Sequence, residues 1–169
     1  MGVRKSIVLL FLLSISCPCA AKEWRGIVPL KSTRTDVERL LGRPKDPVDA
    51  RYYLPDEIVT IEYSRYACDQ VPTAGGWPTQ PVRWNVKPDV VTLIDVKPRR
   101  PVPLSSLSID LSSFKRISGV HPVSISYYQD HAAGFTIEVF EEEGIEMVRG
   151  YIYEPGAGNE SLLCPKTPK

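Results

Sequence analysis

The residues best able to do chemistry in this chain are its acids, its two histidines and its four cysteines. A hydrolase needs a base held by an orienting group, and His131 beside Asp130 is the candidate pair. The acidic run Glu141, Glu142 and Glu143 could offer carboxylates to a cation, and any two of the chain's 20 acids could be the pair that glycosidases use. Neither pattern is specific, because a solvated loop histidine and a charged hairpin tip look the same in sequence. A small hydrolase using acidic residues or His131 is therefore an alternative interpretation.

The sequence contains none of the common catalytic or metal-binding motifs. It has no GxSxG nucleophile elbow, no SxxK pair, no HExxH pair and no glycine-rich phosphate loop. Consecutive residues of a strand point to opposite faces, so a run of glutamates does not converge on a cation. We therefore expect a protein that is not an enzyme and that has no cofactor and no metal site.

The first 21 residues predict export. Arg4 and Lys5 precede an apolar run over 6–16, and small residues follow up to Ala21. This order is typical of a secretory signal peptide, and the apolar run is too short to cross a bilayer. Cleavage after Ala21 would release one extracytoplasmic domain, residues 22–169, without a transmembrane helix. We expect that domain in the periplasm or outside the cell.

The four cysteines divide into two pairs with different expected fates. Cys17 and Cys19 lie in the export segment, and Cys17 ends a degenerate lipobox. Lipid on Cys17 is the alternative to cleavage, and it would make the protein a lipid-anchored envelope-assembly factor. Cys68 and Cys164 remain as an even pair without CxxC spacing in an oxidising compartment. We predict one disulfide, Cys68–Cys164, which the chain-entropy model values at roughly 4–5 kcal/mol.

The charge balance argues against two classes of partner. The chain has 21 lysines and arginines against 20 acids. Removing Arg4 and Lys5 with the export segment leaves a domain close to neutral. Such a domain creates no attractive field for nucleic acid or for an anionic lipid surface. We expect a protein partner and no nucleic acid.

One helix and several strands must position these residues. Thr33 and Asp36 form a capping-box pattern, and Gly42 is a stop signal. Between them, Val37, Leu40 and Leu41 share one apolar face. The sequence therefore predicts a helix at about 34–41. Strands are expected at 50–54, 58–63, 90–96, 124–128, 135–140 and 145–153.

Together these elements predict an α+β fold. A short N-terminal helix would pack on an antiparallel sheet of about six strands, which ends in a C-terminal meander with loops at 130–134 and 142–144. The segment 104–114 is ambiguous and could hold a single helical turn.

A proline- and tryptophan-rich loop at 69–88 is the candidate binding segment. Aromatic residues on a proline-stiffened loop lose little entropy on binding. Trp77, between Gly76 and Pro78, is the predicted contact residue. The alternative is that Trp77 folds back over the core as a lid.

The segment GIVPLKSTRTDVERLLGRP, residues 26–44, resembles the helix signature of small outer-membrane-assembly lipoproteins of the SmpA/OmlA type. The matching positions are Thr33, Val37, Leu41, Gly42 and Pro44. The signature also occurs in β-lactamase-inhibitor-like domains and in many uncharacterised exported bacterial proteins, the group that the whole chain resembles most. The resemblance implies an extracytoplasmic α+β binding fold without catalytic residues. We expect a non-catalytic envelope or secreted module that binds a protein or supports structure.

Overall fold

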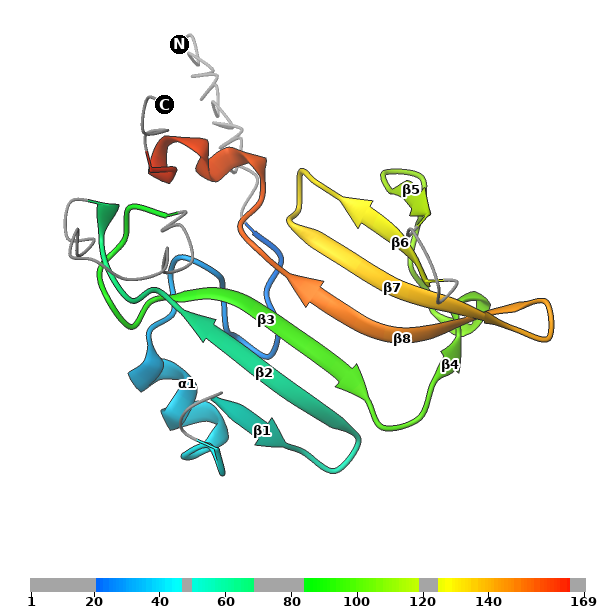
Figure 1. Cartoon of the computed structure of the whole chain (residues 1–169), viewed down its shortest axis with the longest axis horizontal. Helices are drawn as coiled ribbons and strands as arrows, with labels where there is room; N and C mark the ends of the chain where they lie inside the picture. The colour runs from blue at the N-terminus through cyan, green and yellow to red at the C-terminus, as the bar shows by residue number, and fades with distance from the viewer. Residues whose placement is uncertain (1–20, 47–49, 69–83, 119–124, 165–169) are drawn as a thin grey trace, which may run out of the picture.

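The computed structural model describes residues 21–46, 50–68, 84–118 and 125–164 (Figure 1). One antiparallel sheet of eight strands dominates these residues, and one α-helix and two 3-10 turns accompany it. In chain order the elements are α1 (Arg34–Leu41), β1 (Arg51–Tyr53), β2 (Glu57–Tyr63), β3 (Val91–Pro98), β4 (Val102–Pro103), η2 (Leu104–Ser106), β5 (Lys115–Ser118), β6 (Ile125–Asp130), β7 (Phe135–Glu142), β8 (Ile145–Tyr153) and η3 (Ala157–Leu162).

The α+β class is confirmed, but the expected count of six strands is wrong. The two further strands are β4 and β5. β4 has two residues, one of them a proline, and it forms only by pairing with β8 far along the chain. All four residues of β5 are exposed at an edge of the sheet, so β5 lacks the alternating burial that makes a strand visible in sequence. The single helical turn considered for 104–114 is present as η2.

Helix α1 begins and ends as its capping residues predict. The Thr33 hydroxyl accepts a hydrogen bond from the Asp36 N–H, and the Asp36 carboxylate accepts one from the Thr33 N–H at 2.9 Å. Gly42 ends the helix at φ 79°. Val37 is completely buried and Leu41 packs beside it, but Leu40 is 46% exposed, which corrects its predicted place on the buried face. The helix contacts the sheet mainly through Val37 because it has only eight residues.

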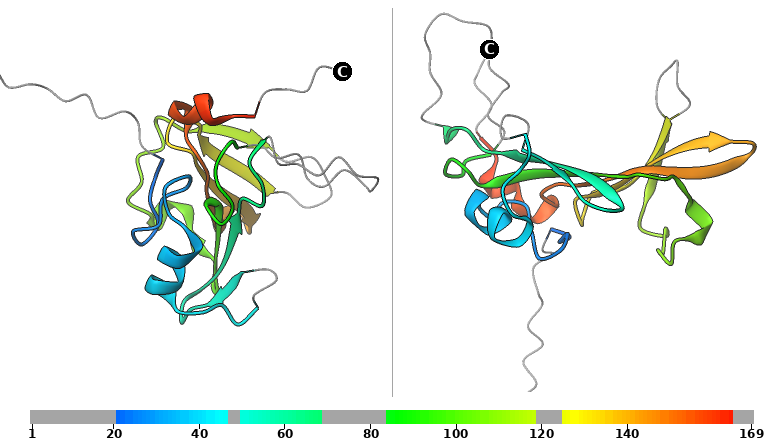
Figure 2. Two further views of the ribbon diagram at one scale, coloured as in Figure 1. Left: turned by 90° about the vertical axis from the view of Figure 1, so that its left-hand side faces the viewer. Right: turned by 90° about the horizontal axis from the view of Figure 1, so that it is seen from below.

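The sheet has the order β1-β2-β3-β8-β7-β6-β5, and β4 also pairs with β8. The helix α1, the segment around Trp24 and Ile27, and the segment after β4 all lie on one side of it (Figure 2). Strand register places one row of side chains on this covered face, and the row crosses seven strands: Tyr52, Val59, Val96, Tyr151, Ile137, Tyr128 and Arg116.

Two apolar clusters fill the covered face. The first lies under α1 and contains Ile27, Val37 and Ile94. The second lies under the segment after β4 and contains Ile137 and Val148. Tyr151 and Tyr153 pack against both clusters, so the core is continuous along the sheet. Burial of this face supplies most of the driving force for folding.

The opposite face of the sheet carries a central ion pair. Lys97 of β3 reaches across β8 to Glu138 of β7, with 3.0 Å between Nζ and Oε2. The strand between them has Gly150 at this point, and a Cβ there would lie 2.9 Å from the Glu138 carboxylate. The glycine inside a strand is therefore explained by the ion pair that passes over it.

A disulfide joins the segment after β2 to the residues after η3. Cys68 and Cys164 are bonded, which confirms the predicted pairing over a sequence separation of 96 residues. Beside it the Asn85 N–H donates to the Leu162 carbonyl at 2.7 Å, so η3 is held next to the entry to β3. Among the described residues, no helix has the length and apolar character needed to cross a membrane.

Candidate functional site

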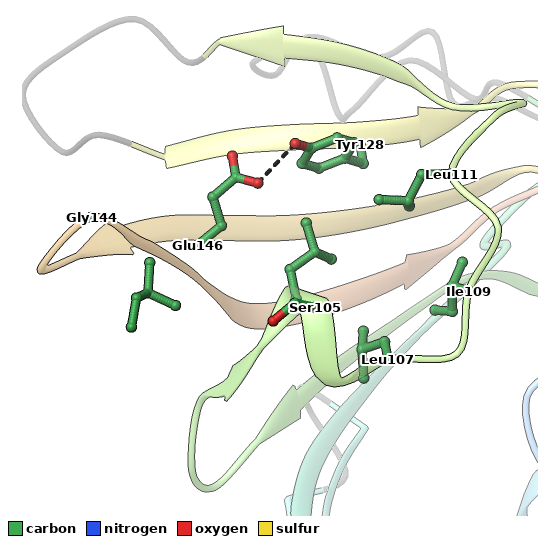
Figure 3. A pocket seen from close by; sticks show the side chains of 9 residues that line it. Ser105, Leu107, Ile109, Leu111, Tyr128, Gly144 and Glu146 are labelled. Atoms are coloured by element: carbon green, nitrogen blue, oxygen red, sulfur yellow. Dashed lines mark hydrogen bonds between the residues drawn. The ribbon is translucent and has the colours of Figure 1, made fainter.

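An open pocket of about 620 Å³, lined by both apolar and polar side chains, lies between the strap, which we define as residues 104–111, and strands β6 and β8 (Figure 3). Aliphatic side chains from the strap form one wall, and Tyr128 of β6 and the start of β8 form the other. The lining residues are Leu104, Ser105, Leu107, Ile109, Leu111, Tyr128, Gly144, Ile145 and Glu146.

Strand β4 sets the position of the strap. Val102 pairs with Val148 and Pro103 with Met147, so the chain leaves β4 directly beside β8. The turn η2 then redirects it over the covered face, where the Ser106 hydroxyl donates to the Pro103 carbonyl at 2.6 Å. Leu104 is buried at this corner and anchors the strap to the core.

Beyond η2 the strap alternates in exposure without pairing as a strand. Leu107, Ile109 and Leu111 are half-buried over the second cluster, while Ser108 and Asp110 are exposed. This Leu-Ser-Ile-Asp-Leu alternation is visible in the sequence and could have identified the lining residues. Sequence reasoning missed them because it treated 104–114 only as an ambiguous element.

Two polar residues of the pocket, Tyr128 and Glu146, are bonded to each other, and the exposed Ser105 also lines it. The Tyr128 hydroxyl donates to Glu146 Oε2 at 2.8 Å (Figure 3). Arg116 Nη2 lies 2.8 Å from the other carboxylate oxygen, Oε1. Burial, together with the hydrogen bond to Glu146, raises the pKa of the Tyr128 phenol. With both its oxygens occupied, Glu146 is suited to holding the pocket wall rather than to accepting a proton from a substrate.

A second feature, the acidic hairpin tip formed by Glu141, Glu142 and Glu143, adjoins the pocket. All three residues are exposed at the end of β7, and Glu143 and Gly144 make the tight turn with φ 53° and 79°. This pair of positive φ values is typical of the hairpin turn that suits twisted strands. Glu141 lies directly opposite Glu146 in the strand pairing. Within the described part of the chain, no salt bridge joins any of the three to a lysine or arginine.

A second hollow, of about 580 Å³, lies beside the start of α1. Its centre is occupied by Arg34, whose Nε donates to Asp89 Oδ1 at 2.8 Å and whose guanidinium lies 4.1 Å from the Tyr63 ring centroid. The hydrogen bond to Asp89 raises the pKa of Arg34, and burial raises that of Tyr63. The Asp89 carbonyl also accepts the Arg34 N–H. These contacts fasten α1 to the residues before β3 and indicate a structural role.

The other predicted site residues lie apart from the pocket or outside the described residues. His131 is exposed in the β6–β7 turn. The Asp130 carboxylate accepts hydrogen bonds from the Ser113 hydroxyl and the Ala133 N–H, and none from the His131 ring. The described residues contain no group of three or more His, Cys, Asp or Glu side chains arranged to hold a metal ion. Trp77 and Cys17 both lie outside the described residues.

The arrangement can therefore bind an apolar group beside a negatively charged rim. No protein-family model, no curated protein and no solved structure matches this chain, so the resemblance to the SmpA/OmlA-type lipoproteins and β-lactamase-inhibitor-like domains stays a prediction.

Proposed function

We propose that this chain is a non-catalytic, exported binding module that holds a segment of another protein in the pocket under the strap. The observation that carries the proposal is the pocket itself: five of its nine lining residues are aliphatic, and its two ionisable side chains, Tyr128 and Glu146, are bonded within the protein. Binding pockets are typically apolar with a few fixed polar groups. A reacting group would instead need a free, correctly placed proton acceptor or nucleophile.

Export is supported by the disulfide. Cys68–Cys164 closes a long loop, and such bonds persist in oxidising compartments. Mass spectrometry of the native N-terminus separates the two routes. A free Lys22 N-terminus is expected if the signal peptide is cleaved after Ala21. A lipid-modified Cys17 at the N-terminus would contradict the cleaved form and identify an envelope-anchored protein.

The binding proposal is tested by comparing two exposed isoleucines. Ile145 lines the pocket and is 51% exposed, whereas Ile117 is 41% exposed on β5 and belongs to the opposite face of the sheet. Peptides are selected from a random display library on the full chain. Their affinity is then measured for the wild type, for Ile145→Asp and for Ile117→Asp.

We expect the selected peptides to bind the wild type and Ile117→Asp equally, and to bind Ile145→Asp at least about tenfold more weakly, because a carboxylate would have to be desolvated in the contact. Circular dichroism and the denaturation midpoint verify that each variant is folded. Selection of no peptide, or equal binding to Ile145→Asp, would show that the pocket is not a protein-binding site.

A further inference from the structure

Resting on the proposed function, we propose that the segment bound in the pocket carries a large apolar side chain flanked by lysine or arginine residues. The apolar side chain would enter between the strap and Tyr128. The cationic flanks would contact the acidic hairpin tip. The proposal thus assigns a partner chemistry to the pocket: an extended, basic segment with an apolar anchor.

The pocket has the size and openness for one anchor side chain. Its volume of about 620 Å³ lies within the range of pockets that bind small ligands, so one large side chain fits into it. The buried Leu104 lies at its floor, and the half-buried Leu107, Ile109 and Leu111 leave apolar surface accessible. Binding of an apolar side chain there is favourable because the side chain leaves water. The hydrogen bond between Tyr128 and Glu146 stays intact when it binds.

The rim of the pocket carries negative charge that the protein itself leaves unneutralised. Arg116 neutralises Glu146, but Glu141, directly opposite Glu146, has no cation of its own in the described residues. Glu142 and Glu143 extend the same charge to the turn beside Gly144, which lines the pocket. Lysine or arginine side chains of a partner would be attracted to the three exposed carboxylates of the hairpin tip.

The pocket and the acidic hairpin tip together disfavour other kinds of ligand. The acids do not form a group arranged to hold a metal ion within the described part of the chain, so a divalent cation does not fit. An acidic or phosphorylated segment would meet repulsion at the rim. A purely apolar ligand would bind the pocket without using the charge, and this is the outcome that the experiment separates.

The test uses three fluorescently labelled synthetic peptides with the same Leu-Phe centre, flanked by lysines, by serines or by glutamates. Their affinities for the folded wild-type chain are measured by anisotropy at low and at physiological salt. A triple variant, Glu141→Gln with Glu142→Gln and Glu143→Gln, removes the charge of the hairpin tip. The matched control changes three exposed glutamates elsewhere, Glu23, Glu62 and Glu160, to glutamine, so that the net charge changes equally.

We expect the lysine-flanked peptide to bind tightest and the glutamate-flanked peptide to bind weakest. The hairpin-tip variant should weaken the lysine peptide by about tenfold in total, the sum of three exposed charge pairs. That peptide should also lose affinity as salt rises. The serine peptide and the control variant should show little change. Ile145→Asp should weaken both the lysine and the serine peptide.

Four outcomes would overturn this inference. If the lysine and serine peptides bind equally and Ile145→Asp weakens both, the proposed binding function stands but the charge preference is wrong. If lysine-flanked binding is unaffected by Ile145→Asp, the attraction is electrostatic alone and the apolar anchor is wrong. If the control variant weakens binding as much as the hairpin-tip variant, net charge rather than the rim is responsible. If none of the peptides binds, the inference fails, and the peptide selection above decides separately whether the pocket binds protein at all.

Discussion

Glu146 bonds to side chains on two other strands and also lines the pocket. Its carboxylate accepts a hydrogen bond from Tyr128 on β6 and pairs with Arg116 on β5, so one polar cluster joins β8 to β6 and β5 across the intervening β7. Arg116 is also the last member of the row of side chains that crosses the covered face. The apolar row therefore ends in a satisfied ion pair, and the pocket wall stays ordered without offering a free carboxylate.

The first prediction concerns that hydrogen bond. Tyr128→Phe should lower the free energy of unfolding by about 1 kcal/mol, because the half-buried carboxylate loses one of its donors. Urea denaturation measures the change. Tyr127→Phe is the control, since Tyr127 lies on the other face of β6 and its hydroxyl makes no hydrogen bond with the other described residues. Equal losses in the two variants would contradict the role assigned to the Tyr128 hydroxyl.

A second prediction concerns pH and the helix cap. Hydrogen bonds from the Thr33 N–H, then from its hydroxyl and from Arg39, lower the pKa of Asp36 to about 2. A carboxyl group with a lowered pKa in the folded state stabilises the fold above its unfolded pKa, and this contribution is lost as the pH falls through the folded value.

Asp36→Asn should therefore lower the denaturation midpoint at neutral pH by an amount that is constant above about pH 4. The difference should shrink as the pH falls and should vanish near the folded pKa of about 2. Denaturation curves over that pH series measure it. A difference that stays constant or grows in acid would contradict the capping role.

At the scale of elements, short connections decide where the site lies. The strap reaches the covered face because β4 pairs with β8 for two residues and η2 then turns the chain. The β6–β7 turn is fixed in a similar way by the segment after β8, since the Glu154 N–H donates to the Gly134 carbonyl at 2.8 Å. Both contacts join parts of the chain that are distant in sequence or separated by a strand.

The third prediction compares two glycines. Gly134 has φ 62°, and a Cβ there would lie 2.0 Å from the Glu154 carbonyl oxygen. Gly26 has φ 79° in a turn with nothing within 4 Å of its added Cβ. Gly26→Ala should cost about 1–2 kcal/mol, the penalty of a left-handed alanine. Gly134→Ala should cost clearly more, because the turn must also move away from the segment after β8. Thermal and urea denaturation measure both, and equal costs would show that the close contact yields easily.

For the whole molecule, the disulfide is a covalent constraint between distant parts of the chain. It joins the residues after β2 to the end of η3, across a separation of 96 residues. The two apolar clusters lie along one face, and among the described residues Tyr151 and Tyr153 pack against both. A cross-link that limits the unfolded chain has a large effect on such a fold.

The fourth prediction is that Cys68→Ser with Cys164→Ser lowers the free energy of unfolding by up to roughly 4–5 kcal/mol, the loop-closure value for a loop of this length. Urea denaturation of the wild type and of the double variant measures it. The wild type in reductant should match the variant, which separates loss of the bond from the effect of serine. A loss of less than about 1 kcal/mol would contradict a stabilising role.

Several features of the fold could be predicted from local sequence. The bounds of α1 follow from Thr33, Asp36 and Gly42, because a capping box and a glycine stop depend on neighbouring residues only. Four of the longer strands appear close to their expected places because alternating burial leaves a period-two pattern. Cys68–Cys164 followed from counting the cysteines that remain after the export segment.

The candidate site could not be predicted in the same way. The residues that the sequence offered as an alternative catalytic pair, His131 and Asp130, lie where β6 ends and its turn begins, and Asp130 bonds to other groups. The pocket is instead built by Leu107, Ile109 and Tyr128, whose types signal only core packing. These side chains form a pocket wall because they are only half-buried, and their degree of burial depends on how the surrounding elements pack.

By itself the sequence determined the class of fold, the helix and its caps, the main strands and the disulfide partners. Each of these depends on short-range periodicity, on capping residues or on a count of cysteines. Only the tertiary structure decided the order of the strands, the two-residue pairing of β4 with β8, and the placing of the strap over Tyr128 and Glu146. These features arise from pairing between distant segments, whose energies are shared among many residues and leave no local pattern.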